Sequence, residues 1–390
     1  MSPSGDGFVV RRAVAPALPG PLAGLCAGGL DDRARWYFAT SEGVLVGADL
    51  ESGERFCEVA LPFPLYPADR EPVSLGAQLC ASPDGAFVAV AERRGLKGAV
   101  VDAGSGRVVH TFEREAYHPE HCTYPLAFVD AHRLVHGIAW NQLAVLDVAT
   151  GARTLPSEAA ASFDYFFGAL AVSPGGRRLS SSGWVWQPIA VTVVFDVERV
   201  LRGEAPVTLG GLDGEAWDLP MCWLDDDRVA LFATDADDQG QLVIDDVSVA
   251  NRPLRVKPCP VPLELGSHRG ELLLLGEVTE ARSVDTLDPL ARLAKPTVAW
   301  HPGTREALGF EQPDGSGAWH LVSRPRPPGP IPGVIIEQAR QARAAGTREA
   351  RLVLADALES AGLVGPDLQH LRTEGPHGTR CHVVDDLASG

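Results

Sequence analysis

The chain has 390 residues, of which 45% are hydrophobic and 22% charged, and its formal net charge is −17 at pH 7. This acidic balance argues against nucleic-acid and anionic membrane partners, because both require clustered basic side chains. No apolar run reaches the roughly 20 residues of a membrane-spanning helix, and residues 1–7 lack the features of a signal peptide, so we expect a cytoplasmic protein.

Two kinds of turn organise the first clearly patterned unit. The segment 81–92 is an alternating strand entered through a Ser-Pro-Asp-Gly turn at 82–85, and the next strand, 98–102, leads into an Asp-x-x-Ser-Gly turn at 102–106. In such turns proline fixes φ and glycine supplies a positive φ. The pattern therefore predicts short antiparallel strands joined by tight hairpins.

Both turns recur in phase along the chain. The Ser-Pro-x-Gly turn returns at 173–176, and a His-Pro-Gly-Thr variant lies at 301–304. The Asp-x-x-Ser/Thr-Gly turn begins at Asp49, Asp102 and Asp147, with looser copies at Asp196, Asp246 and Asp285. A period of about 40–50 residues with four strands per unit is typical of a β-propeller.

We predict an all-β, seven-bladed β-propeller, with six or eight blades as the alternatives, followed by a small C-terminal α-helical domain. The blades are expected at 22–62, 75–113, 124–156, 168–209, 219–258, 262–295 and 297–322. The last unit has only three strands in the sequence. We expect residues 7–14 to supply the fourth, because this pairing joins the chain ends and removes open strand edges, which invite aggregation.

The C-terminal part of the chain changes character. We divide the chain into a propeller over 1–322, a proline-rich linker over 323–333 and a small helical domain over 334–390. The linker is too rich in proline to form a helix or a central strand. After it we expect one helix over Val334–Ala345, a second capped by Thr347 and a third that starts at Pro366. The side chains expected to face inward are Leu352, Ala355, Leu358, Leu368 and Leu371.

The units resemble the bacterial WD-repeat-like and YVTN-type propellers, whose blades carry Ser-Pro-Asp-Gly and Asp-x-x-Ser/Thr-Gly-Arg turns. The resemblance covers residues 7–322 but departs from the eukaryotic WD pattern, because Gly-His near the blade starts and Trp-Asp at the third strand's end are missing. It implies a scaffold for protein binding, although such propellers also host enzymes. Residues 351–387, which begin Arg-Leu-Val-Leu-Ala-Asp-Ala-Leu-Glu, resemble a short bacterial domain that accompanies repeat modules, and this implies an accessory helical module without a reaction.

One segment partly matches a calcium-binding loop. Asp235, Asp237 and Asp246 occupy positions one, three and twelve, with Gly240 at position six. Position five is Gln, however, and position twelve lacks the bidentate Glu of such loops. The alternative is a polar hairpin tip between two strands.

Two groups of histidines and cysteines could offer zinc ligands. The first is His118, His121 and Cys122, with His132 and His136 close behind, but its spacing is not of a zinc type, and loop and rim histidines are the alternative. The second lies in the tail and consists of His370, His377, Cys381 and His382. There the alternative is packing or turn structure. We predict no metal, no cofactor and no catalytic residue.

An aromatic-rich stretch is the candidate partner-binding site, because interfaces favour Trp and Tyr, while packing between blades is the alternative. Its residues are Tyr165, Phe166, Phe167, Trp184 and Trp186. The function that we predict is a non-enzymatic protein-interaction scaffold, whose acidic propeller suits a basic or mixed-charge protein partner. The alternative is a propeller enzyme, or a protein that binds a small ligand or cation at the central axis.

Overall fold

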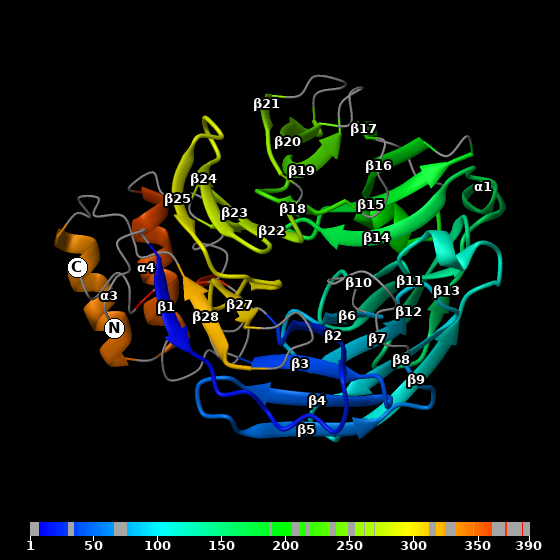
Figure 1. Ribbon diagram of the computed structural model, residues 1–390, viewed down its shortest axis with the longest axis horizontal. Helices are drawn as coiled ribbons and strands as arrows, with labels where there is room; N and C mark the ends of the chain where they lie inside the picture. The colour runs from blue at the N-terminus through cyan, green and yellow to red at the C-terminus, as the bar shows by residue number, and fades with distance from the viewer. Residues whose placement is uncertain are drawn as a thin grey trace.

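Seven four-stranded antiparallel sheets are arranged in a ring in the computed structural model (Figure 1). The structure describes residues 8–29, 35–65, 76–186, 189–204, 211–214, 219–234, 239–248, 254–260, 262–268, 270–311, 317–323, 333–345, 347–360, 371–372 and 384. Within these residues, the seven sheets and two C-terminal helices confirm the predicted fold class.

Six blades consist of four consecutive strands, which follow one another from the channel outward. The first three blades are β2 (Leu22–Ala27), β3 (Arg35–Thr40), β4 (Val44–Asp49) and β5 (Arg55–Ala60); β6 (Ala77–Ala81), β7 (Phe87–Glu92), β8 (Lys97–Asp102) and β9 (Arg107–Glu113); and β10 (Leu126–Phe128), β11 (Arg133–Ala139), β12 (Gln142–Asp147) and β13 (Arg153–Thr154). The next three are β14 (Phe166–Val172), β15 (Arg178–Val185), β16 (Ile189–Asp196) and β17 (Gly211–Gly214); β18 (Met221–Trp223), β19 (Arg228–Thr234), β20 (Gly240–Asp246) and β21 (Arg255–Pro258); and β22 (Glu264–His268), β23 (Glu271–Leu275), β24 (Thr279–Ser283) and β25 (Pro289–Leu293).

The middle strands of each blade are buried on both faces, because a neighbouring blade packs against each side of the sheet. Four consecutive residues of β7, 88–91, are buried, and so are residues 98–101 of β8. Alternation is therefore lost there, and the strands are continuously apolar, as in any sheet covered on both faces. The outermost strand β9 keeps an alternating pattern: every second residue is exposed to solvent, and the residues between are buried or half-buried.

The predicted Asp-x-x-Ser/Thr-Gly turns are stabilised by their own carboxylates. Asp102 Oδ1 accepts hydrogen bonds from the backbone amides of Gly104 and Ser105, at 2.9 and 3.0 Å. The same two bonds form at Asp49 and Asp147. Each turn ends at a glycine with positive φ, which a residue with a Cβ adopts at a cost. The turn chemistry thus acts locally in each blade.

The fourth blade differs from the sequence prediction. The looser turn at Asp196 is instead the start of a short helix, α2 (Val197–Leu201), and Asp196 Oδ1 caps it by accepting a hydrogen bond from Arg199 N at 3.3 Å. The blade's strands span residues 166–214 and not 168–209. Another helix that the sequence analysis missed, α1 (Glu158–Ala161), precedes this blade.

The seventh sheet is completed by the N-terminal part of the chain. Strands β26 (Ala299–His301), β27 (Glu306–Phe310) and β28 (Trp319–Ser323) are followed in the sheet by β1 (Val9–Arg12), which pairs antiparallel with β28. Arg11 on β1 stabilises this closure. Its guanidinium forms one ion pair with Glu306 of the same blade and another, at 2.8 Å, with Glu51, which belongs to the first blade.

Two C-terminal helices pack against each other and lie at the edge of the ring in the view of Figure 1. They are α3 (Gly333–Ala345) and α4 (Arg348–Ser360), and Thr347 Oγ1 accepts a hydrogen bond from Ala350 N at 3.3 Å at the start of α4. Their core includes Leu354, Ala355 and Leu358, whereas Leu352, expected inside, is half-buried. None of the described helices is long and apolar enough to span a membrane.

Candidate functional site

The structure divides the predicted partner-binding aromatics into buried and exposed residues. Tyr165, Phe166, Phe167 and Trp184 are at most 4% exposed, whereas Trp186 is 54% exposed. Tyr165 and Phe167 point to one side of the sheet and pack with Phe195, and Phe166 points to the other, as alternation along a strand requires. Of the five, Trp186 is therefore the residue that a partner can reach.

Phe166 and Trp184 form a tight stack. Their ring centroids lie 3.7 Å apart with an interplanar angle of 9°. The two strands approach closely here, because a Cβ on Gly183 would lie 2.0 Å from the Phe166 carbonyl oxygen. Trp184 Nε1 also donates a hydrogen bond to Cys122 Sγ at 2.9 Å. The stack is thus fixed by ring contact, backbone proximity and a polar bond.

Tyr117 adds a second exposed ring that the sequence analysis missed. It is 40% exposed and lies parallel to Phe166, at 6.0 Å and 19°. Trp186 lies 5.6 Å from Phe166 at an interplanar angle of 54°, and His118 contacts both Tyr117 and Trp186. We call Tyr117, His118, Trp140, Phe166, Trp184 and Trp186 the aromatic platform.

The aromatic platform lies on one face of the ring. Its residues come from the connection between β9 and β10, from the β11–β12 and β15–β16 turns, from the end of β15 and from the first residue of β14. Because successive strands of a blade are antiparallel, the second hairpin of a blade and the crossover to the next blade lie at the same end. Side chains that are distant in sequence thus meet above blades three and four.

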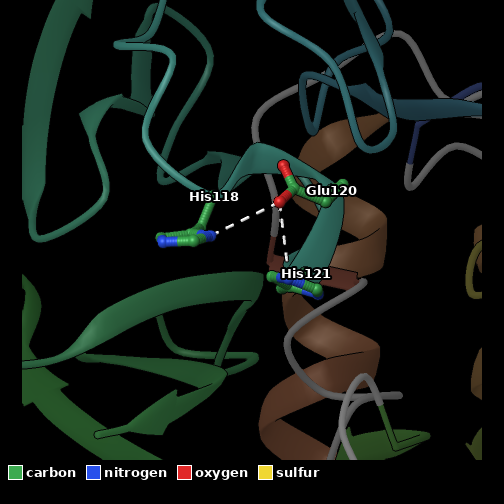
Figure 2. A group of neighbouring side chains, drawn as sticks. All are labelled: His118, Glu120 and His121. Atoms are coloured by element: carbon green, nitrogen blue, oxygen red, sulfur yellow. Dashed lines mark hydrogen bonds and ion pairs between the residues drawn. The ribbon is translucent and has the colours of Figure 1, made fainter.

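A group of metal-ligating side chains borders the aromatic platform. His118, Glu120 and His121 have ligand atoms that all lie within 4.8 Å of one another. As Figure 2 shows, one oxygen of Glu120 faces both imidazoles, at 3.4 Å from His118 Nδ1 and 3.3 Å from His121 Nε2. Hydrogen bonds from its own backbone amide and from His118 lower the pKa of the Glu120 carboxyl below its usual value.

Arg114 fixes the turn that carries His118, Glu120 and His121 through hydrogen bonds to its backbone. The three residues form part of the short 3₁₀ helix η1 (Pro119–His121) and its N-cap, His118, which has a φ of 49°. The buried guanidinium of Arg114 donates hydrogen bonds to the carbonyl oxygens of Pro119, at 3.0 Å, and Cys122, at 3.2 Å. The turn is therefore anchored to the body of the propeller at both ends.

The other sequence candidates do not join this group. Cys122 is buried with its sulfur directed to Trp184, so it does not lie with the histidines as a ligand. His136 is buried against Phe112, and His132 packs on Phe87 elsewhere. Burial lowers the pKa of His136 to about 4, so its imidazole is neutral at pH 7. Asp235, Asp237, His370, His377, Cys381 and His382 lie outside the described residues, so the calcium loop and the tail metal site stay predictions.

The central channel contains a cavity of about 550 Å³. The innermost strands line it with mostly apolar side chains, and among the described lining residues no carboxylate occurs. Three cysteines lie there: burial raises the pKa of Cys80 to about 12 and also raises the pKa of Cys26 and Cys222. They are therefore neutral thiols at pH 7 and not thiolate nucleophiles.

The comparisons with known proteins concern the fold. No protein-family model matches the sequence, and no curated protein matches it. Among solved structures, U3-55K is similar with a TM-score of 0.52 and 13% identity over 80% of this chain and 98% of that one. In all, 1392 solved chains match, which is expected for a widely used architecture and carries no information on activity. The chain is thus a seven-bladed, WD-repeat-like β-propeller in fold.

Proposed function

We propose that the chain is a non-enzymatic protein-interaction scaffold that binds a basic or mixed-charge protein segment at the aromatic platform. The observation that carries this proposal is the exposure of Trp186 and Tyr117 above a buried aromatic stack. Trp and Tyr dominate the binding energy of protein interfaces. Rings already held by Phe166 also lose little conformational freedom when a partner binds.

Charge supports a basic segment as the partner. The chain carries a net charge of −17, and the exposed carboxylates of Glu115 and Glu120 lie close in sequence to Tyr117. Arginine and lysine side chains bind the faces of Trp and Tyr through cation–π attraction. A segment that contains Arg or Lys can therefore contact a ring face and a carboxylate together.

Fluorescence anisotropy with labelled peptides tests the proposal. Arg/Lys-rich, mixed-charge and acidic peptides of equal length are titrated with the full chain at low and physiological salt. We expect binding of the first two classes, weaker at higher salt because screening reduces charge attraction. Trp186→Ala should weaken binding at least about tenfold, as expected for an interface hot spot.

The matched control is Leu290→Ala, because Leu290 is also a large exposed apolar residue but lies on β25 in blade six. It should bind the peptides like the wild type. Equal affinities of the two variants, or no preference for basic over acidic peptides, would contradict the proposal.

A second candidate function is the binding of a small, mostly apolar ligand in the central channel. The observation that favours it is the cavity of about 550 Å³, a volume within the usual range of ligand pockets. A cation is a weaker candidate, because burial raises the pKa of Glu264, at the start of the channel strand β22, to about 8, so this carboxyl is mostly neutral at pH 7. Native mass spectrometry of the purified chain would reveal a retained ligand.

The finer classification is also part of this proposal. The phased turns support a bacterial, YVTN-type propeller, and α3 with α4 supports an accessory helical module. None of the six described cysteines forms a disulfide, which supports a cytoplasmic location, where thiols stay reduced. Fractionation of the native host with an antibody to the chain tests the location.

A further inference from the structure

The 3₁₀ helix η1 brings two imidazoles onto one side of a turn. His118 is the N-cap of η1 and His121 is its last residue. Their ring centroids are 5.6 Å apart with an interplanar angle of 29°. Pro119 between them fixes its own φ, so the turn has little freedom to separate the rings.

Glu120 completes a set of two nitrogens and one oxygen at distances that suit a tetrahedral metal ion. Metal–ligand bonds of about 2.0–2.1 Å at tetrahedral angles separate neighbouring ligand atoms by about 3.3–3.4 Å. The Glu120 oxygen lies 3.4 Å from His118 Nδ1 and 3.3 Å from His121 Nε2. These separations exceed the usual 2.7–3.2 Å of an N–H···O hydrogen bond. These contacts are long for hydrogen bonds, so a metal ion that takes the place of their protons requires little change in the positions of the ligand atoms.

The surroundings leave the site accessible and fixed in place. The imidazoles of His118 and His121 are 39% and 44% exposed, so an ion can reach them from solvent, and their ligand atoms lie within 4.8 Å of each other. Arg114 is a nearby cation, but its Nε and Nη2 groups donate hydrogen bonds to backbone carbonyl oxygens. The negative charge of the whole chain raises the local concentration of cations.

We propose that His118, Glu120 and His121 form a zinc site with three protein ligands and an open fourth position. Two imidazoles and one carboxylate are a ligand set of zinc sites that keep an exchangeable ligand, usually water. The rings of Tyr117 and Trp186 contact His118 and therefore border the site. This proposal does not depend on the scaffold function, because it rests on the ligand geometry alone.

Isothermal titration of the EDTA-treated, dialysed full chain with ZnCl₂ tests the site. We expect one equivalent of zinc to bind, and Co²⁺ added in its place should give the visible absorption of a tetrahedral ion. Glu120→Gln and His118→Asn should each weaken zinc binding at least about tenfold, because even a residue that only orients a ligand is worth about 10–100-fold in affinity. Asparagine is chosen at 118 because it tolerates the positive φ of that position.

The matched control is His132→Asn, which removes an exposed histidine that packs on Phe87 and not at the site. Its zinc affinity should equal that of the wild type. If His118→Asn fails to fold, as judged by its thermal transition without metal, His121→Gln replaces it. The proposal is overturned if no zinc binds, or if zinc binds with an affinity that Glu120→Gln and the histidine variant leave unchanged.

Discussion

At Gly183 the stack of Phe166 and Trp184 requires a close approach of two strand backbones. A Cβ at this position would lie 2.0 Å from the Phe166 carbonyl oxygen, and a carbonyl cannot move without its strand. We therefore expect Gly183→Ala to lower the free energy of unfolding by about 1–3 kcal/mol, the usual cost of overpacking. Urea unfolding followed by tryptophan fluorescence measures it.

Gly104→Ala is the control for this change, because a Cβ there would meet its nearest atom, Asp102 Oδ1, at an ordinary 3.4 Å. It should unfold like the wild type. A Gly183→Ala variant that is as stable as this control would show that the two strands can separate at no cost.

His301 makes the stability of the last blade depend on pH. It is buried, its Nδ1 accepts a hydrogen bond from Thr304 N at 3.2 Å, and its Nε2 donates one to the Arg35 carbonyl oxygen at 3.0 Å. Burial lowers its pKa to about 4, against about 6.5 in the unfolded chain. Between these values the unfolded state binds more protons, so the free energy of unfolding falls as the pH drops from 6.5 to 4.

We expect this residue to account for about 2 kcal/mol of lost stability between pH 7 and pH 5. His301→Gln removes the titrating group, so the variant should be less stable than the wild type at pH 7 but should lose less stability on acidification. Urea unfolding of both proteins at pH 7, 6 and 5 compares the slopes. Parallel curves would mean that His301 does not take up a proton on unfolding.

At the scale of elements, the fourth blade uses a carboxylate from the fifth. In the second blade, Ser82 Oγ donates to Asp84 Oδ1 within one turn. The equivalent turn of the fourth blade has glycine at 175, and Asp226 supplies the missing group: its Oδ1 accepts from Ser173 Oγ at 2.6 Å and from Gly175 N at 2.7 Å. Although burial acts to raise its pKa, these hydrogen bonds and that of Arg177 lower it. The two blades are thus linked through one side chain.

Because Asp226 takes the role in the fourth blade that Asp84 has in the second, we predict a compensating pair of mutations. Asp226→Ala should destabilise the protein by about 1–3 kcal/mol, because the hydroxyl of the buried residue Ser173 loses its acceptor. Gly175→Asp alone should also destabilise it, since its Cβ would lie 2.0 Å from Asp226 Oδ2. The double variant should be more stable than either single one, because it restores a carboxylate as in the second blade. Thermal unfolding of all four proteins gives the coupling energy, and simple additivity would contradict the prediction.

For the whole molecule, the position of the helical tail leads to a deletion experiment. Residues of α3 and α4, with Leu371 and Val384, form a hydrophobic cluster that contains none of the described propeller residues. We therefore expect removal of residues 334–390 to change the Tm of the propeller by less than about 2 °C, which corresponds to under about 1 kcal/mol for a chain of this size. Differential scanning calorimetry measures this. Loss of soluble expression would indicate that the tail covers propeller core.

Much of the ring could be predicted from the sequence because its turns are stabilised locally. Asp49 and Asp102 bond amides two and three residues ahead, so the sequence alone contains both partners. The failure at Asp196 has the same origin, because the bond from its carboxylate to the amide three residues ahead also caps a helix. The distinguishing signal is the residue four positions on: it is Gly53 after Asp49 but Val200 after Asp196. Val200 is helical in α2, whereas Leu287 in blade six adopts a φ of 58° at the equivalent turn position, so a glycine favours the turn but is not required for it.

The site could be predicted only in part, because its members meet through tertiary structure. The stretch that contains Trp184 and Trp186 stood out by composition, but the exposure of each ring depends on where β15 ends. Tyr117 and Glu120 lie in a connection without periodicity, and the stacking of Tyr117 on Phe166 joins the connection that precedes blade three to the first strand of blade four. No local pattern contains that information.

Closure of the ring by β1 also sets an order of events during synthesis. Arg11 and its partner Glu306 are 295 residues apart, so at a translation rate of about 5–20 residues per second the N-terminal strand leaves the ribosome about 15–60 s before its sheet is made. During that interval the first blade lacks its neighbour, the seventh blade, to which the Arg11–Glu51 ion pair links it. The early strands also have exposed edges. The nascent chain therefore depends on chaperones or on rapid blade-by-blade folding for far longer than a small domain does, and slow codons before β28 should reduce the yield of soluble protein.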